Sequence, residues 1–522
     1  MLSRSTLKRL RGTVPRPHLH RPQTPPLTLM TVSALPLAPQ RSSNSSSTSP
    51  TPSTPTSSSP GPPPTHPSPS WTSQSPSQEV QLRNGTVAFQ TWKNPPPPIY
   101  MQFYFFNVTN PEEVLNGGKP FVEEKGPYTY REYKPKENVT FLDDGQKVSA
   151  VTTKTYVFVP ELSNGDPETD LIRTVNIPVV TLMNMVRYSS VQILLLKALL
   201  IAERAGIFTT RTVHKLLWGY KDPVLSAIHF LEKDVDDYFG LYYKMNKTDD
   251  GEYVFLTGQK SYKNFTTIVE WRGNNSLDWW TTDACNMING TDGTSFHPLI
   301  TKNETLLFFS SDLCRSLYAN FEQELSVKGI PVLRFVPPSE IFANITVNPE
   351  NAGFCVPAGN CLGSGLLNVS TCKQGAPIIL SSPHFYQADQ KYIDDIEGMH
   401  PDKANHETFL DINSLTGLLV RAAKRVQINV YIEPIAGFDQ TETIQTLVFP
   451  VMYLNESVLI DNASAAKLNS MLLQSKVVTV IPFMIMGLGI LFGLIFVILV
   501  CTNRNEINEA SEAERTPLLK PS

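Results

Sequence analysis

The chain of 522 residues has no excess of positive charge: 44 lysines and arginines stand against 48 aspartates and glutamates, which gives a formal net charge of −4. It also lacks a stripe of basic residues with interleaved aromatic side chains, the pattern that binds phosphates and stacks on bases. These two absences exclude a nucleic-acid-binding protein, so we expect no nucleic-acid partner.

No signature of a common catalytic site is present either. The chain contains no G-x-S-x-G nucleophile elbow, no H-E-x-x-H zinc helix and no P-loop. His400 and His406 are spaced wrongly for two metal ligands on one helix face, and Asn289–His297, NGTDGTSFH, lacks the alternating acids and closing glutamate of a calcium loop. We therefore expect no enzymatic activity, no metal and no cofactor.

Cysteine is scarce, with six in the whole chain. In an oxidising compartment the cysteines ahead of residue 477 would pair and leave one over, because their number is odd. The short loop CVPAGNC could be closed by a bridge between Cys355 and Cys361. No second cysteine pair and no nearby histidine pair completes a zinc site. The cysteines ahead of residue 477 are Cys285, Cys314, Cys355, Cys361 and Cys372.

One long segment lacks charge altogether. Val477–Cys501, VVTVIPFMIMGLGILFGLIFVILVC, runs for 25 residues without a charged side chain. About 20 apolar residues cross the hydrocarbon core of a bilayer, so this segment predicts a transmembrane helix. Lys476 and Arg504 flank it on its two sides, and basic residues therefore do not orient it.

Glycosylation sequons orient the helix instead. Twelve N-x-[ST] sites lie between residues 80 and 476, and none lies in residues 502–522. This distribution predicts a glycosylated luminal domain at 79–476 and a cytosolic tail at 502–522. The twelve asparagines are Asn84, Asn107, Asn138, Asn246, Asn264, Asn274, Asn289, Asn303, Asn344, Asn368, Asn455 and Asn462.

The cytosolic tail ends in EAERTPLLKPS, in which Glu514 precedes the pair Leu518 and Leu519. Two leucines on a short free tail bury no surface, so their role is to be bound by another protein. The spacing matches the acidic dileucine signal of clathrin adaptors. Such a signal is a receptor-read address and not an anchor. We expect it to route the protein through endosomes to lysosomes.

Residues 1–78 differ in composition from the rest of the chain. They begin with a basic stretch and continue into a run rich in proline, serine and threonine. Such a segment cannot bury enough apolar surface to offset its chain entropy, so we expect it to be disordered. Leu27–Ala38 is the candidate for the apolar region of a signal peptide, although it is short and flanked by proline.

Residues 79–476 have the pattern of a folded domain. Runs of β-branched and aromatic residues at 99–111, 147–160, 425–435 and 446–460 predict strands near both ends. A helical stretch at about 181–240 lies between them. Its segment Ser189–Gly206 is apolar on nearly every side. It is either the central helix of a small bundle or a helix with one face exposed to a partner or to lipid.

Long segments of the chain resemble a known family. They include QFYFFNVTNPEE, GPYTYRE, LLWGYKD, CNMINGTDG, SFHPLI, GNCLGSG, PHFYQAD and FPVMYLNES. On these segments the chain, from about residue 80 to its end, resembles the class B scavenger receptors. The dileucine tail favours the lysosomal member of that family over its plasma-membrane relatives.

The resemblance implies an α+β fold. The luminal domain would be a large antiparallel β-barrel-like structure with an apical helical bundle and a hydrophobic tunnel, followed by the C-terminal transmembrane helix. It also implies disulfides Cys314–Cys372 and Cys355–Cys361, with Cys285 left free. Family members carry a second membrane helix at the N-terminus, and residues 1–78 stand in its place here.

The resemblance further implies a non-enzymatic receptor in the lysosome membrane. It would bind β-glucocerebrosidase with its apical helix and carry the hydrolase to lysosomes. The alternative is a scavenger receptor or transporter that binds lipids such as cholesterol or phospholipid in the tunnel. Family receptors have a histidine in the apical helix that is linked to release at low pH, and Gln192 aligns with it here. His214 and His229, in the neighbouring helical stretch, are either substitutes for that histidine or ordinary surface or packing residues. The residues expected to contact the hydrolase are Gln192, Ile193, Leu195, Leu196, Leu199 and Leu200.

Overall fold

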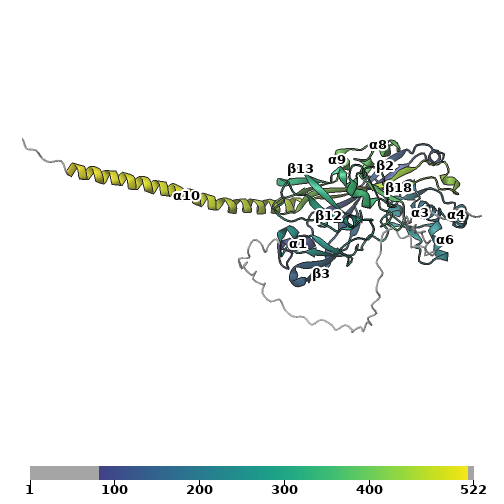
Figure 1. Ribbon diagram of the computed structural model, residues 1–522, viewed down its shortest axis with the longest axis horizontal. Helices are drawn as coiled ribbons and strands as arrows, with labels where there is room; N and C mark the ends of the chain where they lie inside the picture. The colour runs from purple at the N-terminus through teal and green to yellow at the C-terminus, as the bar shows by residue number, and fades with distance from the viewer. Residues whose placement is uncertain (1–80, 515–522) are drawn as a thin grey trace, which may run out of the picture.

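The computed structural model describes residues 81–514. It shows a folded domain from which one long helix projects (Figure 1). The predicted segment 1–78, including Leu27–Ala38, and the pair Leu518 and Leu519 lie outside the described residues.

An antiparallel sheet of eleven strands forms the centre of the domain. Its main path runs β12-β13-β14-β17-β18-β19-β1-β2-β5, so β12 and β5 are the end strands. The first and last long strands of the domain pair with each other, with Ile99 opposite Val458. The strands are β1 Ile99–Val108, β2 Val122–Tyr133, β5 Thr155–Phe158, β12 Leu306–Ser310, β13 Arg315–Val327, β14 Ile330–Val336, β15 Leu366–Asn368, β16 Ile378–Ser381, β17 Phe409–Ile412, β18 Leu419–Ile432 and β19 Leu447–Leu459.

Smaller sheets complete the β structure. A four-stranded sheet has the order β11-β10-β4-β3, and two strand pairs, β6 with β7 and β8 with β9, lie near the helices. The four-stranded sheet packs on α1 (Val87–Lys93), where the ring of Trp92 meets that of Phe255 edge to face. These strands are β3 Lys136–Leu142, β4 Lys147–Thr152, β6 Leu171–Val175, β7 Phe208–Thr212, β8 Tyr220–Lys221, β9 Tyr238–Phe239, β10 Glu252–Leu256 and β11 Ile268–Trp271.

Three of the longer helices gather at one end of the domain. They are α3 Ile177–Val186, α4 Ser190–Ala202 and α6 Pro223–Leu231, and they lie at the end opposite to the projecting helix (Figure 1). The predicted helical stretch 181–240 is therefore not continuous, since β7, β8 and β9 interrupt it and α3 begins before it. The remaining short helices are α2 Pro111–Leu115, α5 Val213–Trp218, α7 Asp283–Asn286, α8 Gln390–Asp394 and α9 Lys403–His406, with 3-10 turns at Asp143–Gly145, Pro160–Leu162, Tyr262–Asn264, Ser339–Phe342, Pro349–Phe354, Pro383–Phe385 and Asp439–Thr441.

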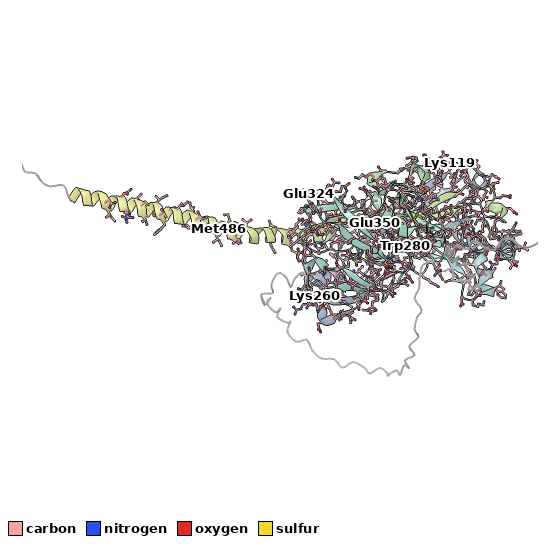
Figure 2. All side chains as sticks on the ribbon, viewed as in Figure 1. Lys119, Lys260, Trp280, Glu324, Glu350 and Met486 are labelled. Atoms are coloured by element: carbon pink, nitrogen blue, oxygen red, sulfur yellow. A yellow bond between two sulfur atoms is a disulfide. The ribbon has the colours of Figure 1, made fainter. Side chains whose placement is uncertain are left out.

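The projecting helix, α10, runs without a break over Asn462–Glu514. Its first turns belong to the domain, because Ala465, Leu468 and Leu472 are buried in a cluster with residues of β14 and β18. Its segment Val480–Asn505 is long and apolar enough to cross a membrane and is not buried in the domain. Met486, within that segment, stands clear of the domain (Figure 2).

These features confirm the coarse prediction of a mixed α and β protein with a large antiparallel sheet and an apolar C-terminal helix. The structure also contains the two disulfides that the family resemblance implied, Cys314–Cys372 and Cys355–Cys361. Cys285 is free and buried. The bridge from Cys314 ties the turn after β12 to the segment between β15 and β16.

Candidate functional site

An apolar surface covers α4 and the end of α6, two helices that pack against each other. Its side chains are 66 to 92% exposed, although each is large and apolar. We call this surface the α4–α6 patch. It consists of Tyr188, Val191, Leu194, Leu195, Ile201, Phe230 and Leu231.

The structure divides the six residues expected to contact a protein partner. Leu195 is exposed, whereas Leu196 and Leu200 are 6% and 3% exposed and belong to the core. Because these two are four positions apart, they lie on one side of α4, which is its packing side. Gln192, Ile193 and Leu199 are half-buried at the boundary. Leu196 and Leu200 are therefore packing residues, whereas Val191, Leu194 and Ile201, which are not among the six, are exposed.

A loop that follows β18 fixes the buried side of α4. The Lys197 ammonium lies 3.0 Å from an Asp439 carboxylate oxygen. Gly437, with φ +94°, lies against Ile193, where a Cβ would come within 2.9 Å of the isoleucine Cγ2. A side chain at position 437 would therefore push α4 outward, so a glycine at this position allows α4 to pack closely against the loop.

The two histidines near the patch have different surroundings. His214 Nδ1 lies 2.7 Å from a carboxylate oxygen of Glu168, and both side chains are well exposed. His229 Nδ1 lies 2.5 Å from the carbonyl oxygen of Val235, so this nitrogen carries the proton and donates. His229 directly precedes Phe230 of the patch, whereas His214 stands at the start of α5.

Two cavities lie inside the domain. The first, of about 170 Å³, reaches Trp92 of α1, Pro95 and Val458 near the start of α10, and we call it the membrane-side cavity. The second, of about 120 Å³, is lined by α3 residues Ile177 and Thr181, and we call it the helix-side cavity. Each is far larger than the space that one water occupies. They adjoin each other, because both are lined by Met101, Tyr242, Met245, Asp312 and Lys424.

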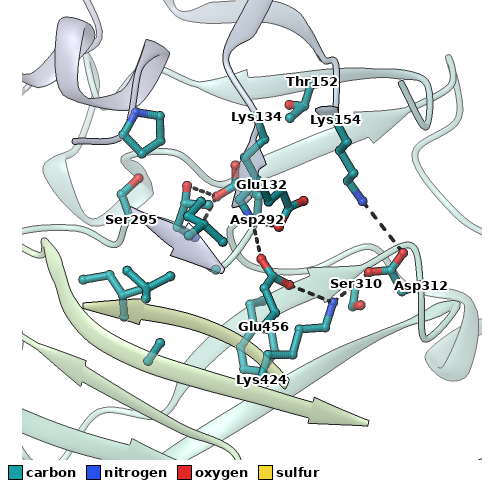
Figure 3. Close-up of a pocket in the computed structure, with 18 of the residues that line it drawn as sticks. Glu132, Lys134, Thr152, Lys154, Asp292, Ser295, Ser310, Asp312, Lys424 and Glu456 are labelled. Carbon is teal, nitrogen blue, oxygen red and sulfur yellow. Dashed lines mark hydrogen bonds and ion pairs between the residues drawn. The ribbon is translucent and has the colours of Figure 1, made fainter. Parts of the chain in front are cut away.

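Six charged side chains meet beside this junction, and Figure 3 shows them. Lys424 Nζ lies 2.7 Å from one oxygen of Asp312 and 3.7 Å from Glu456, while Lys154 Nζ lies 3.8 Å from the other oxygen of Asp312. Glu456 also forms an ion pair with Lys134, and Lys134 Nζ lies 4.0 Å from a carboxylate oxygen of Glu132. We call this group the charge cluster. Its members are Glu132, Lys134, Lys154, Asp312, Lys424 and Glu456.

The cluster keeps most of its charges by pairing them. Burial opposes ionisation of Glu456, but Lys134 and Lys424 outweigh it and hold the pKa of Glu456 at about 2. Burial likewise opposes ionisation of Asp312, and Lys154 and Lys424 hold its pKa below the usual range. The pKa of Glu132, in contrast, is raised and not lowered.

Burial raises the pKa of Glu132, and the nearby Lys134 offsets only part of that effect. Its side chain is 2% exposed, and its Oε2 has no hydrogen-bond partner among the described residues. Its other oxygen accepts a hydrogen bond from the Tyr156 hydroxyl. Glu132 is therefore the cluster acid that most readily takes up a proton.

The twelve sequon asparagines all lie on the domain or at the start of α10. Seven are exposed and five are half-buried. The exposed ones are Asn84, Asn138, Asn246, Asn264, Asn274, Asn303 and Asn462, and the half-buried ones are Asn107, Asn289, Asn344, Asn368 and Asn455. The described residues contain no group of three or more histidine, cysteine or acidic side chains that could hold a metal.

Comparisons with known proteins agree with the resemblance. The model of the CD36 family matches residues 66–500. Lysosome membrane protein 2 of Homo sapiens is 56% identical over 449 residues, which cover 86% of this chain and 93% of that protein. The Mus musculus protein of the same name is 54% identical over 447 residues, which cover 86% and 93%. Scavenger receptor class B member 1 of Cricetulus griseus is 37% identical over 437 residues, which cover 82% and 84%.

Proposed function

The chain belongs to the CD36 family, and from that premise we propose that it is a sorting receptor that binds β-glucocerebrosidase and carries it to lysosomes. The lysosome membrane is the location that the sequence predicts, and the names of the closely similar relatives, with the apolar span of α10, confirm it. In this proposal the protein is a receptor and not an enzyme.

The α4–α6 patch carries the proposal. Soluble surfaces seldom leave so many large apolar side chains together in water, and such patches mark binding sites. The patch contains two exposed aromatic residues, Tyr188 and Phe230, of the type that anchors protein interfaces. It lies at the end of the domain opposite to α10 (Figure 1). That position favours a partner in the lumen over a lipid surface.

A charged substitution in the patch tests the capture of the hydrolase. Leu195→Asp should lower the amount of β-glucocerebrosidase that co-precipitates with the full chain by more than about tenfold, since a buried unpaired carboxylate costs several kcal/mol at an interface. Val347→Asp is the matched control, because Val347 is 65% exposed and Leu195 is 66% exposed. Normal capture by Leu195→Asp would show that α4 binds no hydrolase.

Gln192 does not make binding by the α4–α6 patch depend on pH. A glutamine has no charge change between pH 5 and 8, so the proposal assigns capture to α4 but no pH-dependent release to this residue. The cytosolic tail completes the proposed route. Glu514, Leu518 and Leu519 would bind clathrin adaptors.

A second function is favoured by the paired cavities. We propose that lipids such as cholesterol or phospholipid pass through the membrane-side and helix-side cavities, which together would form the family's tunnel under the apical helices. Their shared lining supports a continuous path. Met245→Trp would fill the junction and should lower lipid transfer from donor to acceptor vesicles. Met185→Trp is the control, since Met185 is exposed on the surface, and equal transfer by both variants would contradict the path.

A further inference from the structure

Two loops from distant parts of the chain pair with each other beside the start of α10. The first covers residues 295–300 and the second covers residues 413–418, and we call them the paired loops. The backbone N–H of Phe296 donates to the Gly417 carbonyl oxygen at 3.0 Å. Gly417 has φ +71°, and a Cβ there would come within 2.2 Å of the Phe296 carbonyl oxygen, so this close approach requires a glycine.

Each of the paired loops has one leucine that is exposed to water. Leu299 is 54% exposed and Leu415 is 40% exposed, and they are neighbours, because the Leu299 N–H donates to the Leu415 carbonyl oxygen at 3.4 Å. Phe296 and Ile300, on either side of Leu299 in the sequence, are buried in the core. Leu299 itself has φ +60°, a left-handed conformation that a bulky residue adopts only under strain. The loop is therefore anchored on both sides of a strained, exposed leucine.

The second of the paired loops packs on the first turns of α10. Leu418 lies against the apolar cluster that contains Leu468 and Leu472 of α10. The side-chain amide of Asn413 donates to the Pro331 carbonyl oxygen at 2.9 Å, at the start of β14, a strand that contributes to the same cluster. The paired loops therefore lie at the end of the domain from which α10 leaves.

The membrane begins close to this end of the domain. Leu472 is buried, and it precedes the charge-free segment at Val477 and the apolar span at Val480 by about 8–12 Å along the helix. The polar region of one leaflet is about 5–8 Å deep. Met471 and Leu473 are already 40% and 63% exposed, so an apolar surface continues from the span back to the domain. The base of the domain therefore lies near the lipid headgroups.

An aromatic side chain and two lysines border the paired loops. Tyr262 is 40% exposed, and its ring lies 6.2 Å from the ring of His297 in the first loop. Lys260 and Lys263 beside it are exposed, and Lys260 stands at the same end of the domain as the start of α10 (Figure 2). Tyrosine and lysine are frequent at membrane interfaces. An acid is present too, since Glu304 pairs with His297 at 2.9 Å, so the apolar residues and not a net charge favour contact with a bilayer.

We propose that the paired loops insert Leu299 and Leu415 into the headgroup region of the bilayer that α10 crosses. The partner is the membrane surface, and the contact is independent of the hydrolase and of the two cavities. Burial of the leucines removes apolar surface from water, and α10 already holds them beside the membrane, so little further freedom is lost. The sequons at Asn264, Asn303 and Asn462 lie in neighbouring segments, and the test therefore keeps the glycans in place.

A fluorescent probe on each leucine tests the contact. The glycosylated full chain is placed in phosphatidylcholine nanodiscs with an NBD dye on Leu299→Cys or Leu415→Cys, in a Cys501→Ser background because Cys501 is exposed and Cys285 is buried. Leu194→Cys is the matched control, since Leu194 is 69% exposed and belongs to α4 at the opposite end (Figure 1). Phosphatidylcholine with a nitroxide in its acyl chain should quench most of the emission of the two loop probes and leave the control unchanged.

A charged variant links the signal to apolar contact. Leu415→Asp should restore most of the emission of the probe at position 299, because a carboxylate is unfavourable where water is excluded. Val347→Asp is its control, since Val347 is 65% exposed and the same charge there should leave the quenching unchanged. Full quenching in the Leu415→Asp variant would overturn the insertion.

The colour of the dye emission distinguishes the remaining outcomes. Quenching of the loop probes together with a blue shift supports insertion. Quenching without a shift would show that the loops lie beside the bilayer in water. A blue shift without quenching would show that a protein surface, such as a second copy of the chain, covers the leucines, and absence of both would show that they face water. Each of these last three results would overturn the proposal.

Discussion

Removal of one positive charge should stabilise this protein. Burial lowers the pKa of the Lys373 ammonium to about 8, and Asp312 only partly opposes this effect because Lys154, Arg272 and Lys424 repel the added charge. Lys373→Met keeps an unbranched side chain of similar length and removes the charge. We expect the variant to unfold at a higher temperature than the wild type at neutral pH.

The size of the effect follows from the pKa. A change from the ordinary value of 10.5 to about 8 corresponds to roughly 3 kcal/mol of unfavourable burial in the charged form. Water can enter the cavities that Lys373 lines, so this figure is an upper limit and a gain of about 1–3 kcal/mol is expected. In a thermal melt of the full chain with its disulfides intact, that gain corresponds to a rise of a few degrees.

The pH dependence distinguishes this cause from better packing. Between pH 5 and 7 the lysine is charged in both the folded and the unfolded chain, so the advantage of Lys373→Met should be constant. Between pH 8 and 10.5 the unfolded chain binds more protons than the folded one. Wild-type stability from this group therefore rises with pH, and the advantage should disappear.

A second variant completes the test. Lys424→Met should instead destabilise by about 1–3 kcal/mol, since it breaks partly exposed ion pairs with Asp312 and Glu456. Destabilisation by Lys373→Met, or an advantage that persists at pH 10.5, would refute the reasoning.

Three further predictions concern the charge cluster, the tail and the whole chain. Asp312→Asn should lower the free energy of unfolding in urea by about 1–3 kcal/mol, because two partly exposed lysines, Lys154 and Lys424, lose their partner. In the wild type the low pKa of Asp312 means that this stabilisation is complete above its unfolded pKa of 3.8 and is lost as the pH falls below that value, so it should persist at pH 5. Leu518→Ala combined with Leu519→Ala should move the protein to the cell surface in a biotinylation assay, and unchanged lysosomal staining would contradict adaptor binding. Removal of N-glycans from the full chain made in cells should increase its gel mobility strongly, whereas an unchanged mobility would place the domain in the cytosol.

The long strands could be predicted because their signal is local. Each predicted run at the two ends of the domain contains a strand, since alternating β-branched and aromatic residues need only their neighbours to indicate a half-buried surface. The buried side of α4 could not be predicted in this way. When a helix is apolar on every side, its sequence does not indicate which side is buried. The loop that covers α4, with Gly437 and Asp439, lies more than two hundred residues away in the sequence.

The charge cluster was missed for a related reason. Its six residues come from five segments of the chain, since only Glu132 and Lys134 are neighbours, and the fold brings these segments together. The alternation of inward and outward residues along β18 and β19 did indicate two members of the cluster. Lys424 shares its face of β18 with Val426 and Ile428, and Glu456 shares its face of β19 with Leu454, so two opposite charges occupy inward positions on paired strands. Charged residues at apolar positions of adjoining strands predict a buried ion pair.

The α4–α6 patch and the charge cluster both depart from the rule that apolar side chains are buried and charged side chains are exposed. The patch leaves large apolar side chains in water, and the cluster with Lys373 places charge inside. Each lowers the stability of the isolated domain, while the remaining strands and core follow their local patterns. Such exceptions persist in a folded protein where function requires them. The patch therefore calls for a protein surface that covers Tyr188 and Phe230.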